Sequence, residues 1–303
     1  MPLWLPQLSR REFLRRAALT GAAAVVAPSV LAELAAKPRD PDLWFFLSDT
    51  HIAANPATIS HRVNMTDHLA AVVREVLAWP AAPEAIIVNG DLAFKLGQAG
   101  DYAAFGKLIE PLRVLAPLHL TLGNHDEREN FWRAFPLDAT KSEAVPGKQI
   151  TIFPSARANW FLLDSLDVTD IFPGRLGVPQ LDWLTREIEA RPGQPAMVVC
   201  HHHLDRHGEV GGLKDSAPVI ELLASHRQVK AFIYGHTHNW HVSRHEKGLW
   251  LVNLPPTAYV FEPGRPSGWV QARFAADGAE IELRALDRKH AEHAQVKQLK
   301  WRA

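Results

Sequence analysis

Short, mainly apolar runs recur along the chain, and most of them stop at a polar or glycine-containing segment. Runs of this length and character are typical of buried strands. Between several of them, apolar residues recur at helical spacing. Strands that alternate with helices predict an α/β sheet. The predicted strands cover residues 43–47, 85–88, 118–122, 159–163, 196–200 and 231–234, and the predicted helices cover residues 68–79, 102–115, 180–190 and 218–225.

The pattern changes after residue 249, where a strand at 249–253 is followed by two more at 269–274 and 279–286. The last two flank Asp277-Gly278, a dipeptide that favours a tight hairpin turn. Residues 288–303 are charged, and a surface helix or a frayed tail is expected there. We therefore place one domain at residues 41–287 and a charged C-terminal tail at 288–303.

The N-terminal segment has the order of a secretory signal: paired arginines, an apolar stretch and then small residues. Arg10 and Arg11, followed by Phe13 and Leu14, resemble a twin-arginine signal. The alternative is an amphipathic helix docked on the domain. We assign residues 1–36 to the signal, with cleavage between Ala32 and Ala36, and expect a periplasmic or secreted protein that uses the twin-arginine export machinery. The apolar stretch is too short and too rich in alanine for a permanent membrane span.

Composition narrows the function further. The 303-residue chain has 33 basic and 33 acidic residues, and this neutral balance argues against a nucleic-acid partner. The only cysteine, Cys200, follows valines and is expected to be a small buried hydrophobe. The 16 histidines are unusual for a protein without metal or acid–base chemistry. Composition does not indicate the oligomeric state.

Five of the predicted strands end in possible metal ligands. In open α/β sheets, sites form beyond the carboxyl ends of the strands, so these segments should meet. Glycine before a ligand permits a sharp turn and a close approach. Within each D-x-H or H-x-H pair, an extended backbone would point both side chains the same way. The segments are Asp49-Thr50-His51, Gly90-Asp91, Gly123-Asn124-His125-Asp126, His201-His202-His203 and Gly235-His236-Thr237-His238.

Each segment alone is weak evidence, because an aspartate at a strand end is usually a turn or cap residue. Together and in this order they resemble the calcineurin-like metallophosphoesterases, whose signature runs D-x-H, G-D, G-N-H-[DE], H, G-H-x-H. All five parts occur within residues 43–238. The resemblance implies a four-layer α/β/β/α sandwich with the metal site at the C-terminal ends of the strands. Gly174-Arg175-Leu176 and residues 180–184 also resemble the branch of bacterial cyclic-nucleotide (class III) and glycerophosphodiester phosphodiesterases.

The resemblance implies two divalent metal ions and their ligands. Asp49, His51 and His238 would hold the first ion, Asp91 would bridge both, and Asn124, His201 and His236 would hold the second. His202 is the alternative to His201. Imidazole, carboxylate and amide ligands suit iron, manganese, zinc or cobalt about equally, so the ligands do not identify the metal. Fe, Mn and Zn are the ions expected here.

The resemblance also gives His125 the role of general acid, which protonates the leaving oxygen or stabilises the transition state. Asp126 would orient His125, or would only cap the loop. Purple acid phosphatases in this superfamily use a tyrosine three residues after the bridging aspartate. Phe94 occupies that position here and cannot bind iron, which argues against the purple type.

The implied function is hydrolysis of a small phosphodiester, such as a cyclic nucleotide or a glycerophosphodiester, by a metal-bridging hydroxide. A phosphomonoesterase or nucleotidase could use the same site, and a non-catalytic family member is a further alternative that should have lost ligands. After the last metal ligands, a segment rich in proline and aromatic residues suggests a pocket rim. Tyr259 or Phe261 would contact the non-phosphate part of the substrate there, or both would only pack the loop.

Overall fold

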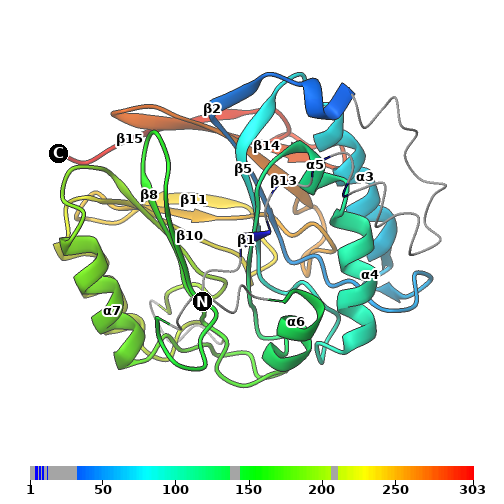
Figure 1. Ribbon diagram of the computed structural model, residues 1–303, viewed down its shortest axis with the longest axis horizontal. Coiled ribbons are helices and arrows are strands. Elements are labelled where there is room, and N and C mark those ends of the chain that lie inside the picture. Colours follow the sequence, from blue (N-terminus) through cyan, green and yellow to red (C-terminus); the bar gives the residue numbers. More distant parts are fainter. Residues whose placement is uncertain are drawn as a thin grey trace.

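The computed structural model describes residues 33–136, 144–205 and 211–303, together with residues 4, 5, 7, 9 and 12. Two β-sheets lie face to face, and helices cover the outer face of each sheet (Figure 1). This is the α/β/β/α sandwich that the resemblance implied, and that prediction is confirmed.

The first sheet has seven strands in the order β1-β6-β5-β2-β13-β14-β15. Strands β2, β5 and β6 are parallel, so their carboxyl ends lie at one edge of the sheet. Strand β13 pairs antiparallel with β2 and forms the expected hairpin with β14. The strands span Trp4–Leu5 (β1), Arg39–Ser48 (β2), Ala82–Asn89 (β5), Leu118–Thr121 (β6), Gly268–Phe274 (β13), Gly278–Ala285 (β14) and Val296–Lys300 (β15).

The second sheet has six strands in the order β11-β12-β10-β9-β8-β7. Strands β8, β9, β10 and β12 are parallel neighbours, whereas β7 and β11 pair antiparallel at the two edges. A separate two-stranded ribbon joins β3 (Ile59–Ser60) to β4 (Val63–Asn64). The strands of the second sheet span Thr151–Pro154 (β7), Asn159–Leu162 (β8), Ala196–Val199 (β9), Val229–Tyr234 (β10), His241–Arg244 (β11) and Trp250–Asn253 (β12).

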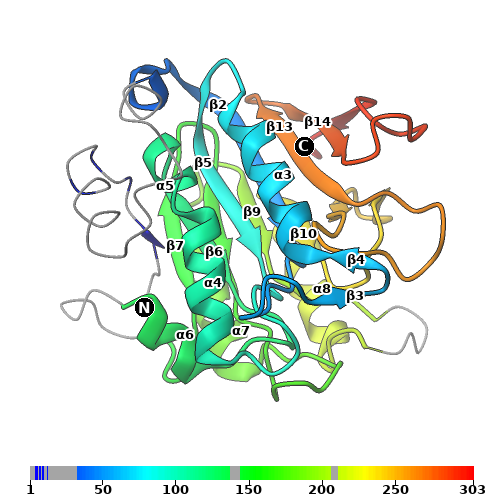
Figure 2. The ribbon, with the colours of Figure 1, turned by 90° about the vertical axis from the view of Figure 1, so that its right-hand side faces the viewer.

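Alternation along the strands produces three buried layers. One face of β2 and β5 packs on the helices α3 (Met65–Leu77), α4 (Ala99–Ile109), α5 (Leu112–Leu115) and α6 (Arg128–Ala134), which Figure 2 shows in front of the first sheet. The opposite face packs on the second sheet, with Trp44 stacked on Trp160 at 4.1 Å between ring centroids. Helices α7 (Val178–Glu189) and α8 (Ser216–Ser225) cover the outer face of the second sheet. As expected, Pro111 separates α4 from α5.

The expectation for residues 288–303 was wrong, because they form neither a surface helix nor a frayed end. They contain β15, which pairs antiparallel with β14. Beyond β15, the buried Arg302 donates hydrogen bonds of 2.6–3.1 Å to carbonyl groups at the end of α8, on β10 and at Lys247. Charge alone suggested a solvated tail, but the buried Leu299 side chain and the arginine anchor this segment to the sandwich.

Most of the predicted signal segment lies outside the described residues, including residues 13–32. Of its described residues, Trp4 and Leu5 pair with β6, and the Gln7 amide donates to the Val114 carbonyl at 2.8 Å. Within the part of the chain that the structure describes, none of the helices has both the length and the apolar character needed to cross a bilayer.

Candidate active site

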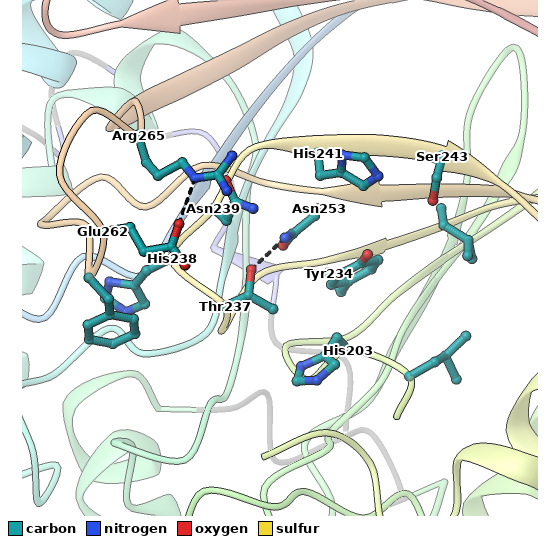
Figure 3. A pocket seen from close by; sticks show the side chains of 13 residues that line it. His203, Tyr234, Thr237, His238, Asn239, His241, Ser243, Asn253, Glu262 and Arg265 are labelled. Carbon is teal, nitrogen blue, oxygen red and sulfur yellow. Dashed lines mark hydrogen bonds and ion pairs between the residues drawn. The ribbon is translucent and has the colours of Figure 1, made fainter. Parts of the chain in front are cut away.

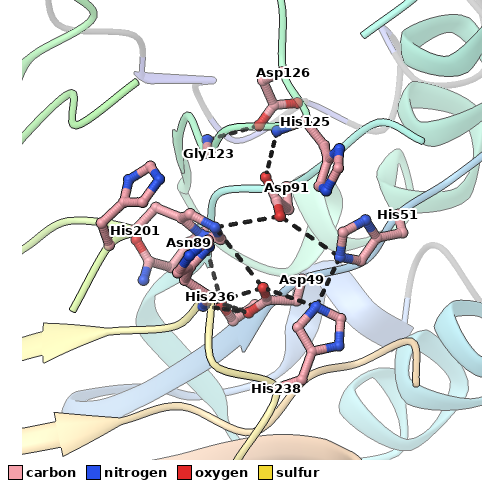
Figure 4. Close-up of polar contacts among 12 residues, drawn as sticks. Asp49, His51, Asn89, Asp91, Gly123, His125, Asp126, His201, His236 and His238 are labelled. Atoms are coloured by element: carbon pink, nitrogen blue, oxygen red, sulfur yellow. Dashed lines mark hydrogen bonds and ion pairs between the residues drawn. The ribbon is translucent and has the colours of Figure 1, made fainter. Parts of the chain in front are cut away.

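The five candidate segments meet at one place because each follows a strand whose carboxyl end points to the same edge of the sandwich (Figure 4). Asp49 and His51 follow β2, Asp91 follows β5 and Asn124 follows β6. From the second sheet, His201 follows β9, and His236 and His238 follow β10. The structure therefore brings all seven of the predicted ligand residues to one buried region.

These side chains form two groups that share one carboxylate. The ligand atoms of Asp49, His51, Asp91 and His238 all lie within 4.8 Å of one another, and so do those of Asp91, His201 and His236. Oδ2 of Asp91 lies 3.6 Å from Nε2 of His51 and 3.3 Å from Nε2 of His201. A carboxylate placed between two groups of imidazoles is the arrangement that a bridging ligand needs.

Asn124 completes the second group with an amide. It lines the same hollow as Asp91 and His236, a cavity of about 460 Å³. Both polar atoms of its amide are buried and have no hydrogen-bond partner among the described residues. Such an orphaned group is costly unless something binds it. A metal ion bound through the amide oxygen would satisfy that oxygen, so these residues fit the implied metal centre.

Backbone carbonyl groups orient two of these histidines, and burial keeps two others neutral. The Nδ1 atoms of His201 and His238 face the carbonyl oxygens of Asn89 and Tyr259 at 3.0 and 2.6 Å, which leaves Nε2 of each ring directed at the carboxylates. Burial holds the pKa of His51 and that of His236 well below the usual value. Their rings are therefore neutral near pH 7, as ligation requires.

The two neighbouring histidines of the His201-His202-His203 run differ in their surroundings. Nε2 of His201 faces Asp91, whereas Nδ1 of His202 lies 2.8 Å from the Ser165 hydroxyl. The ring of His202 lies 4.5 Å from that of His236 but belongs to neither group of ligand atoms. This geometry favours His201 as the ligand over its alternative.

The backbone of the ligand segments differs from the expectation. The sequence suggested that the paired ligands converge along an extended backbone, but this was wrong. Left-handed φ angles are uncommon outside glycine and concentrate at functional sites that the surrounding fold holds in place. The paired ligands converge through tight turns after the strands. The alternation of side-chain direction along a strand does not apply within those turns. The ligand residues with left-handed φ angles are Asp49 (φ 52°), His51 (46°), Asp91 (48°), His236 (69°) and His238 (52°).

Glycines let these turns approach each other. A Cβ atom on Gly123 would lie 2.2 Å from Oδ1 of Asp91, and one on Gly90 would lie 2.4 Å from Nδ1 of His201. Gly90 also has a φ of 69°. The glycines before Asp91 and Asn124 therefore serve the close approach that the sequence predicted.

The candidate acid, His125, lies at the mouth of this hollow. Its Nδ1 faces the Lys95 carbonyl at 2.9 Å and Oδ1 of Asp170 at 3.4 Å. Two roles were open for Asp126, orienting His125 or capping the loop, and its contacts favour the second. The buried Asp126 carboxylate accepts hydrogen bonds from Tyr102 and from backbone amides, including that of Gly123 at 2.9 Å, so it shapes the loop. Asp170 was missed because no local signal marks it; it lies on the β8–α7 connection, far from His125 in sequence.

The two aromatic residues suggested for the rim have different positions. Tyr259 is only 7% exposed, and its ring stacks on those of His51 and His61. Phe261 is 56% exposed and stacks on His238 with 4.2 Å between ring centroids. Phe261, and not the packed ring of Tyr259, has the surface available for a substrate.

An α/β/β/α sandwich with a buried centre of this kind at its strand ends defines a class of phosphoester hydrolases, and comparisons with known proteins agree. The model of the calcineurin-like phosphoesterase family matches residues 45–240. The 3′,5′-cyclic adenosine monophosphate phosphodiesterase CpdA of Pseudomonas aeruginosa is 30% identical over 224 residues, which are 72% of this chain and 77% of CpdA. A cAMP/cGMP dual specificity phosphodiesterase of Mycobacterium tuberculosis is 28% identical over 252 residues, covering 80% of this chain and 76% of that protein.

Solved structures show the same fold. A dimetal phosphatase from Danio rerio matches 87% of this chain and 100% of its own, with a TM-score of 0.67 and 14% identity. A purple acid phosphatase from yellow lupin seeds matches 86% of this chain and 53% of its own, with a TM-score of 0.65 and 13% identity. The chain belongs to the calcineurin-like phosphoesterase family, and it is a hydrolase of phosphoric esters. The family and the buried cluster indicate a dimetal site.

Proposed function

We propose that this enzyme hydrolyses phosphodiesters of the 3′,5′-cyclic nucleotide type. The observation that carries the proposal is the shared carboxylate of Asp91, which lies in both ligand groups with His125 at the same opening. The relatives named above act on cyclic nucleotides by name, and they are matched over most of their length. A phosphomonoesterase would use the same ligands, but the named relatives do not favour it.

The chain's residues have distinct tasks in this reaction. We assign Asp49, His51 and His238 to one ion, Asn124, His201 and His236 to the other, and Asp91 to both. Bound there, two divalent ions would polarise the phosphoryl group and offset its negative charge as Lewis acids. His125, next to the carboxylate of Asp170, is placed at the mouth to give a proton to the leaving oxygen. The aromatic ring of Tyr259 covers His51 and His238 and keeps water from their outer faces.

The test is a substrate panel with the purified full domain and with added Mn, Fe or Zn. We expect turnover of cyclic AMP and of bis-p-nitrophenyl phosphate, and slower turnover of p-nitrophenyl phosphate. Faster turnover of the monoester than of both diesters would reject the phosphodiesterase proposal. Elemental analysis of the same samples should find about two ions of Fe, Mn or Zn per chain.

We also propose that residues 1–36 direct export by the twin-arginine route to the periplasm or the medium. The support is the order of paired arginines, apolar stretch and small residues. Replacing Arg10 and Arg11 by lysine should leave the precursor in the cytoplasm, whereas the same change at Arg15 and Arg16 should not. Normal export of the first double variant would reject this route.

A further inference from the structure

The hollow that contains the candidate metal ligands is called the metal hollow below. A second hollow adjoins it, and the proposed mechanism does not use this second one (Figure 3). Its volume is about 490 Å³, within the range of small-molecule sites. The two hollows share His203, Thr237, His238 and Phe261 as lining residues. A substrate whose phosphate lies at the metal ligands can therefore extend into the second hollow without leaving the protein surface.

The second hollow is polar but has little net charge. It lies between the turn after β10, the edge strand β11 with its neighbour β12, and the loop that follows β12. Its carboxylate, Glu262, is paired with its guanidinium, Arg265, at 3.0 Å. The hollow therefore suits a neutral group with several hydrogen-bonding atoms better than a second phosphate.

Two amide side chains have unused acceptors in this wall. The Oδ1 atoms of Asn239 and Asn253 are buried and have no hydrogen-bond partner among the described residues. The Nδ2 atom of Asn253 donates to the Thr237 hydroxyl, which fixes the direction of that amide. Buried acceptors without partners are costly, and a ligand with an N–H group would satisfy them. Both amides line the hollow, and Figure 3 labels them there.

Phe261 adds an aromatic surface at the boundary between the two hollows. One part of the ring stacks on His238, while more than half of the side chain is exposed. Exposed rings of this kind pack well against planar heteroaromatic groups. The same residue lines both hollows, so a planar group packed on it would lie directly beside the metal ligands.

We propose that the second hollow binds the nucleobase of the cyclic nucleotide, with Phe261 packed on the base and Asn239 and Asn253 accepting from an exocyclic amine. This inference rests on the proposed function and adds the part of the site that selects the substrate. Both unused atoms are acceptors, so the hollow selects an exocyclic amine with two N–H donors, as in adenine, over the 6-oxo edge of hypoxanthine, which offers one N–H and one acceptor oxygen. The amides act as specificity-determining residues and take no part in bond breaking.

The experiment compares cyclic AMP, cyclic inosine monophosphate and bis-p-nitrophenyl phosphate on the same preparation of each variant. The ratio of kcat/KM between two substrates does not change when part of the protein is inactive or lacks metal. Asn239→Ala, Asn253→Ala and Phe261→Ala should each lower the ratio of cyclic AMP to bis-p-nitrophenyl phosphate by roughly three- to tenfold, as expected for one lost contact. The two asparagine variants should also lose the preference for cyclic AMP over the inosine analogue.

Two matched controls locate the effect. Phe172 is also an exposed phenylalanine on the metal hollow, but it does not line the second one. The Asn130 amide donates to the Gly97 carbonyl, away from both hollows. Phe172→Ala and Asn130→Ala should leave the substrate ratios unchanged. A changed ratio for Phe172→Ala with none for Phe261→Ala would place the base on the other side of the metal hollow and overturn the proposal.

A binding measurement provides a readout that is independent of turnover. In saturation-transfer NMR with AMP, the base protons H2 and H8 should receive magnetisation from the wild-type protein and less from Asn239→Ala and Phe261→Ala. The contrary result is that the variants hydrolyse bis-p-nitrophenyl phosphate with unchanged kcat/KM ratios and unchanged saturation transfer to the base protons. That result would reject the nucleobase site and leave the phosphodiesterase proposal in place. If metal-loaded wild type hydrolyses neither diester, the proposed function itself fails.

Discussion

The backbone N–H of His125 donates a hydrogen bond of 2.8 Å to Oδ1 of Asp91. The candidate acid and the shared carboxylate are thus joined through the main chain, while Oδ2 of Asp91 faces His51 and His201. A change to the imidazole of His125 leaves this bond in place, whereas a change to Asp91 removes it. The two residues should therefore give different phenotypes, although both lie at the same opening.

Removing the shared carboxylate should remove the metals more than the fold. In Asp91→Ala, bound metal should fall clearly below the wild-type content, and kcat/KM for bis-p-nitrophenyl phosphate should fall by at least about 100-fold. The circular dichroism spectrum should stay close to wild type, because Asp91 lies beyond the end of β5 and outside the hydrophobic core. Full activity in this variant would contradict the shared-carboxylate centre.

Removing the imidazole of His125 should spare metal binding. His125→Ala should keep the wild-type metal content and lose roughly two to four orders of magnitude in kcat for substrates with poor leaving groups. The loss should be smaller for p-nitrophenolate, which leaves without a proton. An equal loss for good and poor leaving groups would show that His125 positions the phosphoryl group instead of protonating the leaving oxygen.

Adding one methyl group at Gly123 should disturb the shared carboxylate. The new Cβ would lie 2.2 Å from Oδ1 of Asp91 and 2.7 Å from Cδ2 of His201, so the loop or the ligands must shift. Gly123→Ala should lower both metal content and kcat/KM, the latter by at least roughly tenfold. Gly193→Ala is the matched control, because no atom lies within 4 Å of the Cβ it would add. Equal behaviour of the two variants would argue against the close approach.

A pH effect on stability should arise far from the metal ligands. His119 is buried against the ring of Phe153 at 3.8 Å, and burial lowers its pKa from the usual 6.5 to about 3. Between these values the unfolded chain binds the proton and the folded chain does not. The free energy of unfolding should therefore fall with decreasing pH across this window, by at most about 1.4 kcal/mol per pH unit from this residue.

The measurement is denaturant unfolding of wild type and His119→Phe at several pH values between about 6.5 and 4. Contributions from other histidines occur in both proteins and cancel in the difference. The variant should lose less stability on acidification than the wild type. Parallel curves would show that His119 does not titrate in this way.

The anchor of the C-terminal segment should be a stability determinant. Arg302 donates to five carbonyl groups on α8, β10 and nearby turns, whereas β15 belongs to the other sheet. Arg302→Ala should lower the free energy of unfolding by roughly 2–4 kcal/mol. Arg288→Ala, which removes an ion pair from a side chain that is 73% exposed, should change it by less than about 1 kcal/mol. Similar values for both would contradict the anchoring role.

Much of the site was readable from the sequence because each ligand segment directly follows an apolar strand. Strand periodicity is local, and parallel strands bring their carboxyl ends to one edge, so residues as distant as Asp49 and His238 could be placed together. The apolar runs and the helical spacing likewise predicted the inner strands of both sheets and most of the helices, but not the edge strands β1, β7, β11 and β15 or the helix α6. These inferences needed only the order of residues along the chain and the rules of sheet geometry.

Tertiary structure decided whatever depends on contacts between distant segments. The choice of His201 over His202 follows from the Asn89 carbonyl and Asp91, and the partner of His125 is Asp170 instead of the adjacent Asp126. The left-handed turns at the ligands and the docking of Arg302 also went unpredicted. Each of these depends on which side chains and carbonyl groups other elements bring within about 3–4 Å, the reach of a hydrogen bond or ion pair, and periodicity along one segment carries no information about that.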